Sequence, residues 1–379
     1  MGFGHVLGFV TPVAAEPERF GAWQIELTTR CRLACRMCIR QGPDPWRSRD
    51  MALEEFERIA RQFQEVDTVV LQGWGEPLLH AHLVEIVRLA KQAGRPASCP
   101  ARAPRAPSVG FVTSGKGLDG PYADALVDAG LDFLGFSLAG VTPATHEAIR
   151  VHSRLDEVTG AAAHVLAAKR RQGRRSPRVH VVFLMLEDNI DELPGLPALA
   201  RDMGADEIVL TNLIHVVDPW QERQKVFGRR EVSGREAILD ETERRARACG
   251  LAMRRPSLTP APAPVCEEDP RRNLYVSAEG EVSPCVYLGP PVSRSFTRRF
   301  GERGHRVERL TFGSAFREPV AAIWGRPAYA AFREGFARRA RRRDLRWLAP
   351  SSWRSGSARW EALPDPPEPC RTCHKLLGV

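Results

Sequence analysis

Short apolar runs alternate with amphipathic stretches between Trp23 and Asn212, as expected for repeated strand–helix units around a parallel sheet. The pattern predicts six strands: Gln24–Thr28, Thr68–Gln72, Val109–Thr113, Phe133–Leu138, Arg178–Met185 and Glu207–Thr211. Apolar residues recur at helical spacing over residues 56–63, 83–90 and 196–203, which predicts helices between the strands. Six units are too few to close an eight-stranded barrel, so we expect an α/β fold with a partial, TIM-like (βα)6 barrel.

A second, smaller unit follows the barrel. The chain turns polar and helical after residue 215 and then enters Pro256–Pro264, a Pro-rich segment typical of a connector between domains. The next residues predict a hairpin with strands Asn273–Ser277 and Glu281–Ser283. We therefore expect four parts: an N-terminal extension (1–22), a barrel domain (23–215), a helical bridge with the connector (216–264) and a small C-terminal α+β domain (265–379).

The composition is that of an ordinary soluble protein. Of the 379 residues, 43% are hydrophobic, and no uninterrupted apolar run is long enough to span a bilayer. The apolar stretch Met1–Ala15 lacks a basic start and is interrupted by Gly, His and Pro, so a signal peptide is not expected. We predict a cytoplasmic location and no membrane partner.

The net charge of +9 comes mainly from arginine, which is concentrated in Lys169–Arg178 and Arg338–Arg346. A basic balance can indicate nucleic acid or an acidic substrate. No aromatic residues interleave with the first run, and no helix-turn-helix or zinc-finger spacing accompanies either one. Solvated faces are the favoured interpretation and a functional anion site is the alternative, so nucleic acid is not expected as a partner.

Three of the nine cysteines, Cys31, Cys35 and Cys38, follow the first predicted strand in a CxxxCxxC array. That position is the carboxyl edge of the barrel, where βα folds place their chemistry. Clustered cysteines in a reducing compartment more often bind metal than form disulfides. Three thiolates leave a four-iron cluster one ligand short, which invites a ligand from outside the protein. A zinc knuckle completed by a distant Cys or His is the alternative.

The array and its surroundings, residues 25–38, resemble the radical S-adenosylmethionine (SAM) superfamily. The resemblance implies that SAM chelates the fourth iron of a [4Fe-4S] cluster through its amino and carboxylate groups. An electron from the reduced cluster then cleaves the sulfonium and yields a 5′-deoxyadenosyl radical, which abstracts hydrogen from a substrate. Arg32 and Met37 depart from residues common in the family, but neither departure removes a cysteine.

Later strands end in motifs that resemble those of the same family. The turn Gln72–Pro77, with Trp74 in place of a glycine, is similar to the GGEP turn that holds the methionine end of the cofactor. The third strand ends at Thr113 and Ser114, and ordinary helix capping is the alternative for that pair. His146 is expected on a helix surface. The resemblance implies cofactor contacts from Gly73, Gly75, Glu76, Thr113, Ser114, Ser137 and Arg150.

Four further cysteines lie in the C-terminal part: Cys266, Cys285, Cys370 and Cys373. Their spacing, with Gly280 between the first two and a CxxC at the end, resembles a shortened, twitch-like form of the SPASM extension of radical SAM enzymes. The resemblance implies that all four bind one auxiliary [4Fe-4S] cluster. A structural zinc site is the alternative. We expect Cys99, Cys249 and His374 to bind no metal.

The sequence therefore predicts a radical SAM enzyme that reductively cleaves SAM and abstracts hydrogen from a peptide or protein substrate, in modification or maturation. A flavodoxin or ferredoxin is the expected electron donor. A small-molecule substrate is one alternative. Another is a non-enzymatic iron–sulfur or zinc protein that carries electrons or binds partners, although it has no need for the glycine turn after the second strand. No residue is assigned as the hydrogen donor, because variable loops form substrate pockets in such folds.

Overall fold

A computed structural model describes residues 20–93, 106–228, 233–348 and 363–379. Its centre is a sheet in which seven parallel strands lie side by side in chain order. They are β1 (Phe20–Ile25), β2 (Val66–Val70), β3 (Ser108–Thr113), β4 (Phe133–Leu138), β5 (Arg178–Met185), β6 (Glu207–Asn212) and β7 (Ala252–Arg254). β4 is apolar along nearly its whole length, as expected for a parallel strand with both faces covered.

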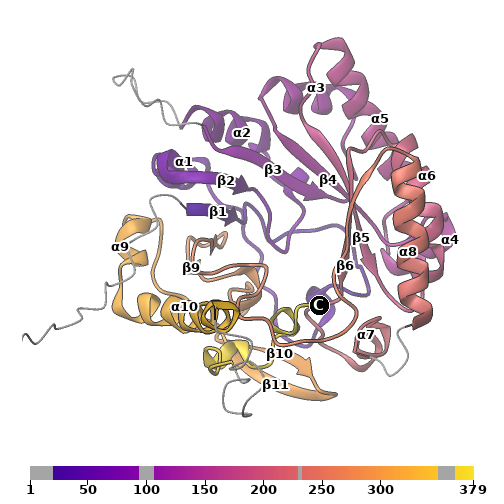
Figure 1. Ribbon diagram of the computed structural model, residues 1–379. Helices are drawn as coiled ribbons and strands as arrows, with labels where there is room; N and C mark the ends of the chain where they lie inside the picture. The colour runs from indigo at the N-terminus through magenta and orange to yellow at the C-terminus, as the bar shows by residue number, and fades with distance from the viewer. Residues whose placement is uncertain (1–19, 94–105, 229–232, 349–362) are drawn as a thin grey trace, which may run out of the picture.

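The sheet continues into the C-terminal part of the chain. β8 (Leu274–Val276) pairs in parallel with β1, and β9 (Val282–Ser283) pairs antiparallel with β8. The strand order is therefore β7-β6-β5-β4-β3-β2-β1-β8-β9. Figure 1 shows the strands in an arc that stays open between β6 and the C-terminal elements. The fold is a partial barrel whose first strand is also the attachment point of the predicted hairpin.

Helices cover the outer face of the arc, except α7, which lies at the open side and contacts the cysteine loop (Figure 1). They are α1 (Leu53–Ala60), α2 (Leu83–Gln92), α3 (Gly120–Asp128), α4 (Pro143–Ile149), α5 (Leu155–Arg171), α6 (Leu196–Asp202), α7 (Pro219–Gln224) and α8 (Ser233–Ala248). Local sequence explains where α3 and α4 begin. The side chains of Asp119 and Thr142 accept hydrogen bonds from the backbone N–H groups of Tyr122 (2.9 Å) and Thr145 (3.3 Å), and a proline follows in each first turn.

The C-terminal part adds a hairpin and two helices to the open side of the arc (Figure 1). They are β10 (Ser295–Phe300), β11 (Arg303–Glu308), α9 (Val320–Trp324) and α10 (Pro327–Leu348). The tail then returns to the connector, where the backbone N–H groups of Ala261 and Ala263 donate to Leu377 O and Leu376 O, both at 2.8 Å. Val379 is 3% exposed and packs in the main core. The tail therefore forms part of the wall on the open side.

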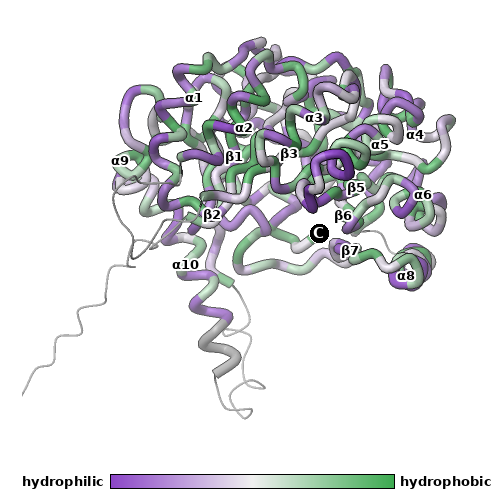
Figure 2. The backbone as a smooth tube through the Cα atoms, turned by 90° about the horizontal axis from the view of Figure 1, so that it is seen from above, coloured by the Kyte–Doolittle hydropathy of each residue, from purple (hydrophilic) through white to green (hydrophobic). Residues whose placement is uncertain are grey.

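The six strands predicted in the barrel are confirmed; β4 and β5 have the predicted ends, and the ends of the other four differ by a few residues. The short β7 and the pairing of β8 with β1 extend the predicted set. Figure 2 shows that hydrophobic residues run through the strands, whereas the outer helices alternate hydrophilic and hydrophobic stretches. This alternation is the expected consequence of packing one helix face on the sheet. In the described part of the chain, no helix combines the length and the apolar character needed to cross a membrane.

Candidate active site

The first three cysteines lie on loop 31–38, directly after β1. Two backbone hydrogen bonds fix this loop against the segment that follows α4: Ala34 N donates to Val151 O at 3.1 Å, and Arg36 N donates to Ile149 O at 3.0 Å. The cysteine loop is therefore held by the barrel on the side of β4, in addition to its covalent attachment to β1. Such anchoring positions three thiols before any ligand binds.

The thiols of this loop lie in an apolar environment. Burial raises the pKa of Cys38 to about 11 and raises the pKa of Cys31, and the neighbouring Cys35 thiol contributes to both shifts. The cluster that packs around the cysteines comprises Leu33, Met37, Ala139, Ile149, Leu184, Leu186, Leu213, Val216 and Trp220. As thiolates, the three sulfur atoms would repel one another. A polynuclear iron cation compensates their negative charges and prefers such soft donors, so the three cysteines fit an iron–sulfur cluster.

The turn after β2 packs tightly against the cysteine loop. A Cβ at Gly75 would overlap the carbonyl oxygen of Thr28, and a Cβ at Gly73 would overlap the Glu26 side chain. Glu26 is fully buried and accepts a hydrogen bond from the backbone N–H of Trp74 at 2.7 Å. The two glycines therefore allow close approach between the turn and the residues before the cysteines. Glu26 was not predicted as a site residue, because its partner lies 48 residues away.

Glu76 connects this turn to the end of β3. Glu76 is 7% exposed, and its carboxylate accepts four hydrogen bonds: from Thr113 Oγ1 (2.6 Å), Ser114 Oγ (2.7 Å), Ser114 N (2.9 Å) and Leu78 N (3.3 Å). The structure thus brings together three of the predicted cofactor contacts. In this arrangement the carboxylate is occupied by protein donors, so its observed role is to position the turn relative to β3.

A cavity of about 660 Å³ opens at the carboxyl ends of the strands. Two of the predicted cofactor contacts, Ser137 and Arg150, line it together with Met37 and Ile39, which flank Cys38. Nε of Arg150 is buried without a hydrogen-bond partner among the described residues. A guanidinium N–H in that state is suited to bind a carboxylate from outside the protein. The cavity therefore combines the cysteine loop, a hydroxyl and an available cation.

Three of the four C-terminal cysteines, Cys266, Cys285 and Cys370, lie in a separate apolar cluster, and Cys373 is close enough to raise the pKa of each of them. Burial and repulsion between the thiols raise the pKa of Cys266 to about 12, and they hold the pKa of Cys285 and Cys370 well above the usual range. The residues around them include Leu288, Val292, Phe296, Val307, Phe332, Phe336 and Leu376. Among the described residues, no three His, Cys, Asp or Glu side chains form a group suited to a single metal ion.

Arg298 supplies a buried positive charge beside these thiols. It is 1% exposed, donates to Thr372 Oγ1 at 2.8 Å and lowers the pKa of Cys373 against the larger effect of burial. Its Nε and Nη1 atoms are buried without partners in the described part of the chain. A buried guanidinium requires a compensating anion. A cluster with four thiolate ligands carries negative charge, so the residues present fit such a group.

Aromatic side chains lie between the two groups of cysteines. Trp74, from the turn after β2, donates from Nε1 to the backbone oxygen of Val286 at 3.3 Å. Its ring lies 5.9 Å from His215 and 5.8 Å from Tyr287, measured between centroids. Trp74, His215 and Tyr287 all line the cavity. The departure from the glycine of the family motif therefore places an indole between the cofactor turn and the segment that follows Cys285.

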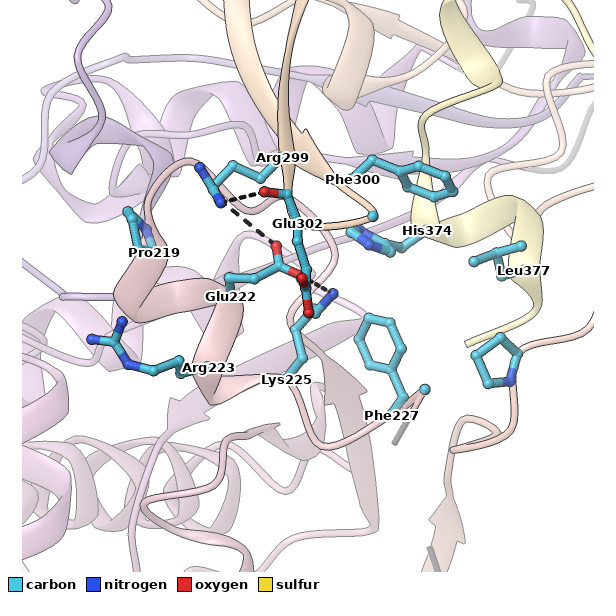
Figure 3. A pocket seen from close by; sticks show the side chains of 13 residues that line it. Pro219, Glu222, Arg223, Lys225, Phe227, Arg299, Phe300, Glu302, His374 and Leu377 are labelled. Atoms are coloured by element: carbon cyan, nitrogen blue, oxygen red, sulfur yellow. Dashed lines mark hydrogen bonds and ion pairs between the residues drawn. The ribbon is translucent and has the colours of Figure 1, made fainter. Parts of the chain in front are cut away.

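A second cavity, of about 610 Å³, lies outside this arrangement, between α7 and the turn of the β10–β11 hairpin. Figure 3 shows the carboxylate of Glu222 between Lys225 and Arg299. Lys225 forms an ion pair with Glu222, and Arg299 also donates to Glu302 O at 2.6 Å. Glu222 thus contacts the cations on either side of it, and none of the predicted site residues lines this cavity.

Family models match two parts of the chain. Residues 25–196 match the model of the radical SAM superfamily, and residues 266–347 match SPASM, described as an iron–sulfur cluster-binding domain. The protein belongs to the radical SAM superfamily. It is an enzyme that uses a [4Fe-4S] cluster with SAM, and its SPASM domain binds an auxiliary iron–sulfur cluster, in place of the zinc alternative. The matched SPASM residues contain Cys266 and Cys285, whereas Cys370 and Cys373 lie beyond them.

Curated radical SAM relatives align over most of the chain. A tungsten-containing aldehyde ferredoxin oxidoreductase cofactor-modifying protein from Pyrococcus furiosus is 27% identical over 316 residues, which is 82% of each chain. PqqA peptide cyclases from Streptomyces rochei and Gluconobacter oxydans are 27% and 25% identical and cover 79% and 69% of this chain and 74% and 68% of their own.

Solved structures of radical SAM enzymes share the fold. Streptococcus suis SuiB bound to SAM superposes with a TM-score of 0.59 at 13% identity, covering 83% of this chain and 68% of its own. Native anSMEcpe with bound AdoMet gives a TM-score of 0.56 at 12% identity and covers 83% of both chains. At this level of identity the similarity concerns the fold.

One histidine of this radical SAM chain, His146, differs from expectation in its burial. His146 was expected on a helix surface, but it is fully buried and its Nε2 lies 3.0 Å from Ser153 Oγ. Burial lowers its pKa to about 4, so it is a neutral core residue. His374 contacts the backbone oxygen of Ile214 through Nδ1 at 3.0 Å. Cys99 lies outside the described residues, and Cys249 is a half-buried free thiol at the end of α8.

Proposed function

We propose that this radical SAM enzyme modifies a peptide or protein, with Cys31, Cys35 and Cys38 as the ligands of the SAM-binding cluster. The observation that carries the proposal is that one continuous cavity of about 660 Å³ is lined both by residues beside Cys38 and by Tyr287 and Lys375 of the C-terminal part. A cavity formed by two parts of the chain suits a substrate that extends beyond a small pocket.

The residues around the cysteine loop have distinct roles in this proposal. When bound, the cluster and SAM supply a 5′-deoxyadenosyl radical for hydrogen abstraction. Arg150 binds the cofactor carboxylate through its available Nε, and Ser137 donates a hydrogen bond within the same cavity. Gly73, Gly75 and Glu76 hold the turn that receives the amino group, and Thr113 and Ser114 fix Glu76. The apolar cluster around the thiols excludes water.

The auxiliary cluster is held, in the same proposal, by Cys266, Cys285, Cys370 and Cys373. The apolar surroundings of the first three, the proximity of Cys373 to them and the buried charge of Arg298 support this ligand set. A flavodoxin or ferredoxin supplies the reducing electron. The division of the chain into parts 1–22, 23–215, 216–264 and 265–379 remains a prediction, and the sharing of one sheet by β1 and β8 means that the second and fourth parts fold against each other.

The relatives support a peptide or protein substrate, because PqqA peptide cyclases align with about two thirds to four fifths of the chain. The cofactor-modifying relative from Pyrococcus furiosus aligns with a slightly larger share of this chain. It favours a second candidate function, modification of a metalloenzyme cofactor. Comparing the products that the enzyme forms from a peptide library with those that it forms from the isolated cofactor of a tungsten-containing oxidoreductase separates the two candidates.

Metal analysis and SAM turnover test the cysteine assignment. Anaerobically reconstituted enzyme should contain about eight irons and, with dithionite, convert SAM to methionine and 5′-deoxyadenosine. Combined replacement of Cys31, Cys35 and Cys38 by alanine should abolish this conversion and leave about four irons. Cys249→Ala is the matched control, because this free thiol lies outside both clusters of cysteines. Continued SAM cleavage by the triple variant would show that the assignment is wrong.

A further inference from the structure

The cavity contains a second set of polar atoms, beyond the residues proposed to hold the cofactor. Asn212 and His215 both line it and are each 4% exposed. Among the described residues, neither Oδ1 of Asn212 nor Nδ1 of His215 has a hydrogen-bond partner. A buried polar atom without a partner costs stability, and a ligand that pairs with it recovers that cost. The two atoms come from the end of β6 and the loop that follows it.

Both atoms are free to accept a hydrogen bond from a ligand. Nδ2 of Asn212 donates to the backbone oxygen of Ser257 at 3.1 Å, which fixes the orientation of the amide and leaves Oδ1 available. Burial lowers the pKa of His215 to about 3 and keeps the ring neutral, while the backbone of Thr297 acts in the opposite direction, as a carbonyl acceptor beside a ring N–H does. The neutral ring therefore keeps its lone pair on Nδ1. A ligand must bring hydrogen-bond donors to satisfy these two positions.

The surface beside these acceptors is aromatic. The His215 ring lies 5.4 Å from Phe296 and 6.3 Å from Tyr287, and Trp74 contacts both His215 and Tyr287 edge-on. Flat apolar side chains of this kind pack against an apolar or aromatic group of a ligand. Tyr287 and Phe296 lie within the matched SPASM residues, so the C-terminal domain contributes to the surroundings of these acceptors.

We propose that Asn212 and His215 bind the substrate through N–H groups of an amide or amine, next to an apolar group packed on Trp74 and Tyr287. This inference rests on the proposed function, since a peptide offers amide N–H donors beside apolar side chains. It adds a specificity to that function: a substrate with donors at this position is preferred over an isostere without them, because the isostere leaves both acceptors buried and unpaired.

Two small probes with the same ring test this preference. Indole-3-acetamide carries amide N–H donors, whereas methyl indole-3-acetate lacks them. In saturation-transfer NMR with reconstituted, SAM-bound enzyme, the amide should bind about tenfold more tightly than the ester. His215→Phe keeps an aromatic ring but removes Nδ1, and Asn212→Ala removes Oδ1; each variant should reduce the preference. Thr211→Val is the control, because its hydroxyl already donates to Phe183 O.

Two results would overturn the inference: equal binding of amide and ester by the wild-type enzyme, or an undiminished preference in both variants. A tenfold loss of SAM affinity in His215→Phe, measured by equilibrium dialysis, would assign the acceptors to the cofactor and also overturn it. Thermal unfolding of each variant establishes that it is folded. Failure of the proposed function is distinct, since it would appear as absence of SAM cleavage by the wild-type enzyme or as absence of any modified peptide, whereas the preference between the two probes is a result on binding.

Discussion

The indole Nε1 of Trp74 donates a hydrogen bond to the backbone oxygen of Val286 at 3.3 Å. Trp74 follows β2 in the cofactor turn, and Val286 follows Cys285 in the SPASM domain, so this bond joins the two cysteine sites across 212 residues of sequence. The same indole contacts His215 and Tyr287, which belong to the substrate end of the cavity. One side chain thus links the cofactor turn, the auxiliary site and the proposed substrate contacts.

Trp74→Phe should remove this bond while leaving most of the ring contacts. We expect a loss of about 1 kcal/mol in stability, the usual contribution of one hydrogen bond, and a lower thermal midpoint in differential scanning fluorimetry. Trp74→Leu should cost more, because it also removes the aromatic contacts with His215 and Tyr287. Equal midpoints for wild type and Trp74→Phe would mean that the bond contributes nothing to the attachment of the SPASM domain.

The sequence was sufficient to predict the strands and the local motifs but not the contacts between distant segments. Parallel buried strands such as β4 and β5 are apolar runs bounded by polar turns, so their ends were predicted to the residue. The pairing of β8 with β1 joins residues about 250 positions apart, and no local pattern encodes it. For the same reason, Glu26 and His215 were not predicted as site residues. The function of a buried glutamate or histidine depends on its contacts, and these come from segments distant in the sequence.

Gly75→Ala should impair cofactor binding and SAM cleavage more than its loss of folding stability alone would explain. The added Cβ would overlap the carbonyl oxygen of Thr28, a backbone atom of the segment leading to Cys31. Because a backbone carbonyl cannot move aside as a flexible side chain does, the turn after β2 must shift away from the cysteine loop. We expect lower SAM affinity and impaired SAM cleavage, measured by equilibrium dialysis and by formation of 5′-deoxyadenosine.

Gly160→Ala is the matched control for this substitution. Gly160 lies inside α5, and a Cβ there would meet no atom within 4 Å. Alanine favours the helix by about 0.5–1 kcal/mol relative to glycine, so this variant should be slightly more stable and fully active. If Gly75→Ala behaved like Gly160→Ala in both assays, close packing of the turn on Thr28 would not be required for cofactor binding.

Glu26 should make stability depend on pH. Burial raises its pKa from 4.5 to about 7, against hydrogen bonds that lower it. Between these two values the unfolded chain is ionised while the folded protein keeps its proton, so the contribution of Glu26 to stability falls as pH rises from about 4.5 to 7. Glu26→Gln retains an acceptor for Trp74 N without this loss. Its stability relative to wild type should rise by about 1.4 kcal/mol for each pH unit in that window.

Thermal midpoints measured from pH 5 to pH 8 on both proteins check this trend. Glu65→Gln, which removes an exposed carboxylate near the start of β2, should instead show a constant difference from wild type. A difference between Glu26→Gln and wild type that does not change with pH would mean that Glu26 ionises alike in the folded and unfolded chain.

Arg298→Met should affect the auxiliary cluster and leave the SAM-binding cluster intact. The guanidinium is 1% exposed and favours the ionised form of the thiols of Cys370 and Cys373. Its loss leaves an anionic cluster without the nearby buried cation, so the cluster should bind less firmly and its reduction potential should become more negative. We expect iron to fall from about eight towards about four per chain, with SAM cleavage retained.

Arg294→Gln is the control. This residue lies just before the same hairpin with a side chain that is 84% exposed, so the variant should keep all the iron. Retention of eight irons together with an unchanged potential in Arg298→Met would mean that the guanidinium serves only its hydrogen bonds to Pro369 O and Thr372 Oγ1.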